Sequence, residues 1–127
     1  MLPNPSPLAV LAQGHKADDG KNRLDLIPAS ALWELGRVYT FGAIKYADWN
    51  WAKGIKYSRI FGALMRHALK WYWGCITNDK ETKCHHLASV AWCAFTLIHY
   101  DQDPSTYRTF DDRPFNAGLV GAIEELE

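Results

Sequence analysis

The chain has 127 residues, 48% of them hydrophobic, and its formal net charge is zero. This length suits one compact domain with one core, and the hydrophobic content argues against a disordered chain. Because no excess of positive charge is present to hold a polyanion along the chain, we expect no duplex nucleic acid partner. A local basic pocket for one small phosphorylated ligand remains compatible with this balance.

The beginning of the chain and its cysteines indicate where the protein works. Residues 1–11 contain prolines but no basic segment, so they lack the pattern of a secretory signal peptide. No apolar stretch reaches the roughly 20 residues of a membrane span. Cys75, Cys84 and Cys93 are an odd number of thiols without C-x-x-C spacing, which indicates reduced cysteines rather than disulfides or a zinc site. We therefore expect a cytoplasmic protein with no membrane partner.

The first part of the chain predicts an extended lead-in followed by a helix. Residues 1–20 carry three early prolines and end in a turn signal, and residues 23–27 predict a short extended or hinge segment. Pro28 favours the first turn of a helix, because its fixed backbone angle suits that position. Apolar residues at helical spacing then predict a helix over 29–46.

Two further helices are predicted downstream. One spans 58–73 and is followed by Gly74, which suits a C-terminal cap. A polar connection leads to a helix over 84–100, which Asp103-Pro104 should end. Because two residues correspond to about 200° of rotation on a helix, Trp71 and Trp73 cannot both face inward, and one of them should lie in the core.

The predicted fold is all-α. We expect a small three- to four-helix bundle with an extended N-terminal lead-in and an irregular C-terminal tail, in which residues 119–126 could form a short helix. We expect residues 1–127 to form a single domain. Six tryptophans and six tyrosines are many for this length. The aromatic faces that stay exposed favour a homo-oligomer.

Four cations stand at or near predicted helix ends or within a helix. Arginine can hold phosphate oxygens through paired hydrogen bonds and lysine as a point charge. The candidates are Lys21, Arg23, Lys45 and Arg66. The alternative is surface charge paired with neighbouring carboxylates. Arg66 is the exception, because an apolar helix flanks it.

Two histidines are candidates for chemistry. His67 suits a base, a metal ligand or a phosphate donor, since its charge is adjustable near neutral pH. The alternative is a core histidine. His86 stands on the first turn of the third predicted helix, where free backbone N–H groups favour an anion. With Thr82 or Ser89 it could bind phosphate, and the alternative is helix capping.

Carboxylates and aromatic residues complete the candidate set. Asp79 and Glu81 could bind a divalent ion that carries a nucleotide's phosphates, or they could cap the third helix. Four tryptophans are candidate platforms for a base, namely Trp49, Trp51, Trp71 and Trp73. Asp48 directly precedes Trp49, and Asn50 lies between Trp49 and Trp51. Asn50 suits reading a base edge or capping a turn.

Several of these residues belong to ordered motifs over about residues 19–100 that resemble the phage domain family named for dATP/dGTP diphosphohydrolases. The motifs are Asp19-Gly20-Lys21 with Arg23 to Pro28, Phe41-Gly42-Ala43 with Lys45, Tyr46, Asp48, Asn50, Trp51 and Gly54, Arg66-His67 with Trp71 and Gly74, Asp79 with Glu81 and Thr82, and His86-Leu87-Ala88. The resemblance implies an all-α, MazG-like, nucleotide-handling protein from a bacteriophage, which would act in the host cytoplasm.

The chain departs from the family pattern at two positions. Cys75 replaces an acidic residue and Ser89 replaces a histidine, and both changes remove metal or phosphate chemistry. MazG-type pyrophosphohydrolases hold magnesium through Glu-x-x-Glu and Glu-x-x-Asp pairs, because several hard cations need clustered carboxylates. Here the first helix offers only Glu34, with Arg37 three residues on, and the third offers Asp101 at its end.

Three hypotheses follow. The first is a protein that binds a purine nucleotide or nucleotide-derived small molecule and sequesters a signal of host defence. The second is an enzyme, a dATP/dGTP diphosphohydrolase that needs Mg²⁺ or Mn²⁺ and uses His67, Asp79 and Glu81 to release monophosphate and pyrophosphate. The third is an oligomerisation module without a ligand. The low carboxylate count favours binding over hydrolysis.

Overall fold

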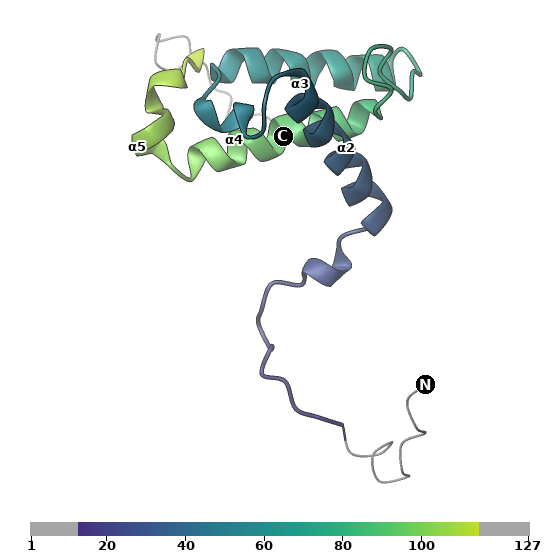
Figure 1. Cartoon of the computed structure of the whole chain (residues 1–127), viewed down its shortest axis with the longest axis vertical. Coiled ribbons are helices and arrows are strands. Elements are labelled where there is room, and N and C mark those ends of the chain that lie inside the picture. The colour runs from purple at the N-terminus through teal and green to yellow at the C-terminus, as the bar shows by residue number, and fades with distance from the viewer. Residues whose placement is uncertain (1–12, 115–127) are drawn as a thin grey trace, which may run out of the picture.

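The computed structural model describes residues 13–114, and these residues are helical wherever they form a regular element, apart from one isolated bridge between Asn78 and His85. The long helices are α2 (Ala29–Lys45), α3 (Tyr57–Tyr72) and α4 (His86–Asp101). The short elements are the 3-10 helices η1 (Leu24–Leu26), η2 (Asn50–Lys53) and η3 (Arg108–Phe110), and helix α5 (Pro104–Tyr107). The all-α prediction is confirmed (Figure 1).

The three long helices begin and end within two residues of the predicted bounds. The largest difference is at the start of α4, where His85 is the N-cap residue and its Nδ1 accepts a hydrogen bond from the Leu87 amide at 3.0 Å. Cys84 and His85 are instead part of the chain reversal before the helix. The helix expected over 119–126 lies outside the described residues.

Two local predictions need correction. The segment expected to be extended before Pro28 contains the 3-10 helix η1. The tail expected to be irregular begins with α5 and η3, because Asp103-Pro104 both ends α4 and starts the next helix. Proline suits a first helical position, and the Asp103 side chain accepts a hydrogen bond from the Thr106 amide at 3.4 Å.

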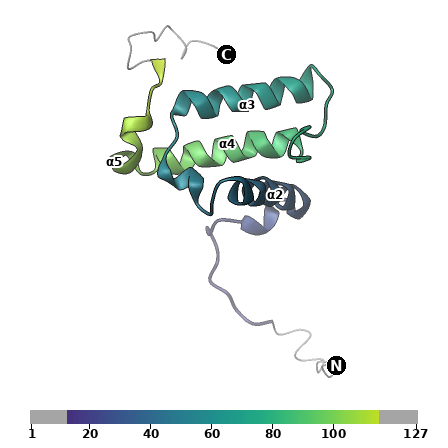
Figure 2. The same ribbon diagram turned by 45° about the horizontal axis from the view of Figure 1, so that its top comes forward.

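Helix α4 is the middle layer of the structure. It packs most extensively against α3 on one side and against α2 on the other, whereas α2 and α3 hardly contact each other. Figure 2 shows these three layers, and it also shows residues 13–23 running away from the helices. The facing sides of α2 and α3 are therefore not packed against each other, and α4 lies beneath both.

A stack of buried tyrosines anchors the connection between α2 and α3. The Tyr100 ring lies between those of Tyr57 and Tyr107, with centroid separations of 5.7 Å and 4.2 Å. The Tyr100 hydroxyl donates to the Trp51 carbonyl at 2.5 Å, and the Tyr107 hydroxyl donates to the Ala52 carbonyl at 2.6 Å. Burial raises the pKa of Tyr100 to about 12, so it remains a donor at any pH near neutrality.

Gly74 follows the end of α3 as predicted, but the reason for a glycine there differs from an ordinary C-terminal cap. The left-handed backbone conformation belongs to Cys75, at φ 53°. A Cβ at Gly74 would instead lie 2.6 Å from the Lys70 carbonyl oxygen, so the close approach of the backbone requires glycine.

Neither of the two tryptophans at the end of α3 is buried. Trp71 is 40% exposed and Trp73 is 77% exposed, so the expectation that one of them lies in the core is wrong.

Large apolar side chains are exposed on the long helices, among them Trp33 and Ile44 on α2 and Phe61 and Leu69 on α3. An extensive exposed apolar surface is typical of proteins that associate, and homo-oligomerisation stays a prediction. Among the residues that the structure describes, no helix combines the length and the apolar character that a bilayer crossing requires.

We expect Gly54→Ala to destabilise the fold. Gly54 has a φ of 103°, and a Cβ there would overlap the Phe110 ring. Strain of this kind costs about 1–3 kcal/mol, so chemical denaturation should show a fall of that size in the free energy of unfolding. Gly36→Ala is the matched control. Nothing lies within 4 Å of its Cβ position on α2, so it should raise stability by about 0.5–1 kcal/mol. Equal effects of the two substitutions would contradict this account.

Candidate functional site

A cleft of about 1100 Å³ lies where α2 and α3 diverge above α4. One wall comes from α2, the other from α3, and α4 supplies the floor through Ser89, Trp92 and Cys93. The connections 46–55 and 79–82 contribute further side chains to the lining. Segments that are far apart in the sequence therefore meet in one concave surface.

Most of the predicted site residues line this cleft. They are Asp48, Asn50, Trp51, Arg66, His67, Asp79 and Glu81. Lys21, Arg23, Lys45 and His86 do not line it. Arg23 belongs to the lead-in and pairs with Asp25 at 2.8 Å. Lys45 pairs with Glu81 at 2.9 Å across 36 residues, which ties the end of α2 to the connection before α4.

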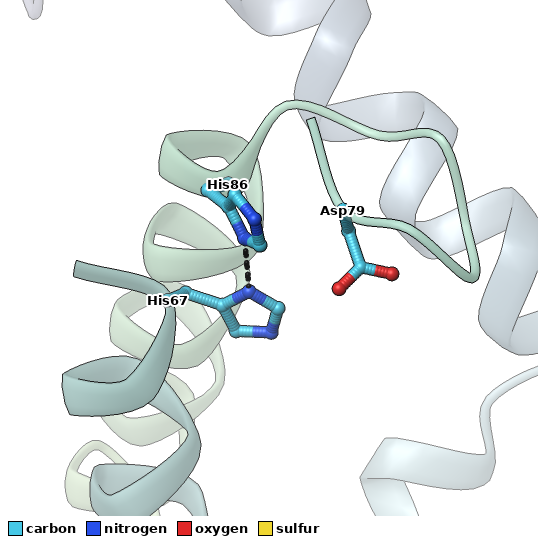
Figure 3. A group of neighbouring side chains, drawn as sticks. All are labelled: His67, Asp79 and His86. Atoms are coloured by element: carbon cyan, nitrogen blue, oxygen red, sulfur yellow. Dashed lines mark hydrogen bonds between the residues drawn. The ribbon is translucent and has the colours of Figure 1, made fainter. Parts of the chain in front are cut away.

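His67, Asp79 and His86 converge from three elements (Figure 3). Each offers one ligand atom, and these atoms lie within 4.8 Å of one another. The Nδ1 atoms of His67 and His86 are 2.8 Å apart, so one nitrogen donates a hydrogen bond and the other accepts it. His86 is only 1% exposed and lies behind His67, which faces the cleft.

The connection between α3 and α4 folds back on itself and places Asp79 beside the histidines. The Asp79 amide donates to the Cys84 carbonyl at 2.7 Å, and the His86 amide donates to the Thr77 carbonyl at 2.8 Å. Lys83 adopts a left-handed conformation at φ 62° that helps the chain to reverse. The first turn of α4 is therefore paired with the strand-like segment that follows α3.

The Asp79 carboxylate is held by the backbone of its own turn. Its Oδ2 accepts hydrogen bonds from the amides of Glu81 at 3.0 Å and Thr82 at 2.8 Å. Asp79 thus caps this turn, and the N-cap of α4 is His85. Burial by itself would raise the pKa of Asp79, but the hydrogen bonds from Thr82 and Glu81 outweigh it and hold that pKa below its ordinary value.

An aromatic group forms the other end of the cleft. The Tyr39 ring lies 6.1 Å from that of Trp51 and 6.2 Å from that of Trp92, and Trp49 lies 6.0 Å from Trp51. Trp49 is 71% exposed and has a left-handed backbone at φ 63°. A bulky residue in this conformation is strained, and such strain concentrates at functional sites.

Sequence reasoning missed two cleft residues that a spacing argument could have found. Arg59 stands seven residues before Arg66 on α3, which places both on one face of that helix. Trp92 stands three residues after Ser89 on α4, again on one face. Ser89, which departs from the family pattern, is buried on the cleft floor, whereas Cys75 is exposed outside it.

Among the described residues, the carboxylates that reach the cleft all come from connections. They are Asp48, Asp79 and Glu81. Glu34 of α2 pairs instead with Arg37 at 3.0 Å and does not line the cleft. Paired acidic side chains on facing helices, which MazG-type enzymes use for magnesium, are thus not found in this part of the chain.

We expect the metal-free protein to lose stability as the pH falls below about 6.5. Burial lowers the pKa of His67 from its ordinary value of 6.5, and His86 lowers it further, although Asp79 opposes them. The unfolded chain therefore binds this proton more readily, so stability is full above pH 6.5 and is lost as the pH falls through the folded-state pKa. Thermal unfolding with EDTA from pH 7.5 to 5 should show this loss. His67→Gln should reduce it, whereas His15→Gln, in the exposed lead-in, should not. Equal acid sensitivity in all three proteins would contradict the assignment.

A family model described as dATP/dGTP diphosphohydrolase, N-terminal, matches residues 12–113. No curated protein and no solved structure matches the chain. The matched region includes the lead-in turn, the three long helices and the connections that form the cleft, so it exceeds the extent over which the motifs were recognised. The resemblance seen in the sequence is confirmed, and the chain belongs to the dATP/dGTP diphosphohydrolase N-terminal family.

Proposed function

We propose that the cleft binds a purine nucleotide or a nucleotide-derived small molecule. The observation that carries this proposal is the composition of the cleft, which combines an aromatic end with two arginines. Neither Arg59 nor Arg66 forms an ion pair with another described residue. An apolar or aromatic pocket with a few convergent polar groups is typical of small-molecule sites.

The aromatic end suits the base. Trp49 is exposed at the cleft and has a tilted ring contact with Trp51, which in turn has an edge contact with Tyr39. Stacking of a base on an aromatic ring contributes about 1–3 kcal/mol. The Asn50 side chain lines the same end, and its amide can both donate to and accept from the edge of a purine.

The wall formed by α3 suits the phosphates. Arg59 and Arg66 are two helical turns apart, roughly 10 Å along the axis. Guanidinium groups bind phosphate oxygens through paired hydrogen bonds. A nucleotide placed along the cleft would thus have its base at the tryptophans and its phosphates against α3.

A protein that holds such a ligand without converting it removes the ligand from solution. We propose that the chain is phage-encoded and sequesters a host nucleotide, such as a nucleotide that acts as a signal in host defence. The family's description supports the nucleotide part of this proposal.

The binding proposal predicts a measurable interaction with dATP or dGTP in isothermal titration calorimetry of the full chain. Trp49→Ala should weaken binding by about 5- to 150-fold, the range that corresponds to one stacked base. Arg66→Gln should weaken it by at least about tenfold, because it removes a charge-assisted contact.

Matched controls lie outside the cleft. Trp33→Ala removes an equally exposed tryptophan from α2, and Arg37→Gln removes an arginine of the same helix. Both should leave the affinity unchanged. The proposal fails if neither purine nucleotide binds more tightly than millimolar, or if the control substitutions weaken binding as much as the cleft substitutions.

Hydrolysis is the second candidate function, and the position of Asp79, Glu81 and His67 on the same cleft favours it. In this reaction water attacks the α-phosphorus of a purine deoxynucleoside triphosphate, and the bond to the leaving pyrophosphate breaks. Mg²⁺ or Mn²⁺ would neutralise charge on the phosphates. The carboxylates of Asp79 and Glu81 would hold the ion, and His67 would orient the water.

The hydrolysis proposal predicts that purified protein with dGTP or dATP and Mg²⁺ or Mn²⁺ releases monophosphate and pyrophosphate in equal amounts. Asp79→Asn keeps an oxygen for the turn amides but removes the charge, so it should abolish release. Asp25→Asn, in the exposed lead-in, should not change it. Nucleotide binding without any product would reject hydrolysis and leave the binding proposal intact.

A further inference from the structure

We propose that His67, Asp79 and His86 form a site for one first-row transition-metal dication, such as Zn²⁺ or Co²⁺, in preference to Mg²⁺. The three side chains come from α3, from the connection after it and from the first turn of α4, and their ligand atoms lie within 4.8 Å of one another. This set differs from the carboxylate pair predicted from the sequence, because Glu81 is absent from it and two histidines are present.

The histidine pair already has nearly the spacing that a metal requires. The Nδ1 atoms are 2.8 Å apart with one proton shared between them. Two nitrogens bound to one tetrahedral zinc are roughly 3.4 Å apart, given metal–nitrogen distances of about 2.1 Å. A dication that replaces the proton would therefore require the two nitrogens to move apart by about 0.6 Å and the rings to turn until both lone pairs point at the ion.

The third ligand is oriented before any ion arrives. The backbone amides of Glu81 and Thr82 hold Oδ2 of Asp79 in place. Outer hydrogen bonds that orient a ligand are a regular feature of metal sites and increase affinity. The cluster also places the carboxylate of Asp79 beside two imidazoles, and no lysine or arginine forms an ion pair with this carboxylate among the described residues.

The ligand types decide which cation fits. Mg²⁺ prefers six oxygen ligands and retains most of its water, whereas imidazole nitrogens suit zinc and its neighbours in the first transition row. Two histidines and one carboxylate would leave at least one coordination position open. Because His67 and Asp79 line the cleft and His86 lies behind them, that position would face the cleft.

The test is a titration of the full chain, freed of metal with EDTA and without nucleotide. Calorimetry should show one Zn²⁺ per chain, and Mg²⁺ at the same concentrations should neither bind nor compete. Co²⁺ should give visible absorption bands that Zn²⁺ abolishes. Absence of Zn²⁺ binding, or equal affinity for Mg²⁺, would overturn the inference.

Substitutions locate the site. His67→Asn and Asp79→Asn should each weaken Zn²⁺ binding by at least about tenfold. His15→Asn removes a histidine from the exposed lead-in, and Cys75→Ser removes an exposed thiol that could compete for Zn²⁺. Both should bind Zn²⁺ as the unsubstituted chain does. Unchanged binding in the first pair, or loss in the second pair, would contradict the assignment.

A measurement on the unsubstituted chain covers the case in which a variant fails to fold. Zn²⁺ should shift the imidazole nitrogen resonances of His67 and His86, and leave those of His85 and His99 in place. Shifts confined to the other histidines would overturn the inference. These zinc experiments contain no nucleotide, so their outcome is independent of the proposed function. If the chain binds Zn²⁺ but no nucleotide, the metal site is supported and only the proposed binding function is rejected.

Discussion

The hydrogen bonds from two buried tyrosines to the connection after α2 are the interaction on which the cleft depends. Tyr100 and Tyr107 stack at 4.2 Å and donate to the adjacent carbonyls of Trp51 and Ala52. Each bond contributes only about 1 kcal/mol net, but a buried tyrosine hydroxyl without an acceptor costs more than that. The connection therefore has one favourable position, and the tryptophans that it carries are placed over the cleft as a consequence.

Helix α4 is the common support for everything else at the site. It supplies the tyrosine stack at one end through Tyr100 and the histidine pair at the other through His86. Helices α2 and α3 both pack on it and diverge from each other, so their facing sides stay open to a ligand. The packing around α4 stabilises the fold without help from this opening. The fold can therefore tolerate the strained backbone of Trp49 and the arginines of α3 that lack ion-pair partners among the described residues.

Some of the residues predicted from the sequence line the cleft and others lie away from it, and the reason differs from case to case. Arg66 and His67 were conspicuous because they interrupt an apolar helix, and both line the cleft. Lys21 and Arg23 were grouped with them because of their charge and their place shortly before the first helix, yet the lead-in runs away from the helices and Arg23 pairs with Asp25. A charge in a connecting segment carries no information about where that segment goes.

The sequence by itself determined the helices and the family. Periodic apolar residues, Pro28 before α2 and Asp103-Pro104 after α4 are local signals that act within one or two turns. The tertiary structure alone decided which side chains meet. It brought the His67 and His86 nitrogens to 2.8 Å across 19 residues, and it brought Asp112 to accept a hydrogen bond from the Ser58 amide at 2.8 Å across 54 residues. Such pairings depend on how the helices pack and on the path of the connections, which no local pattern specifies.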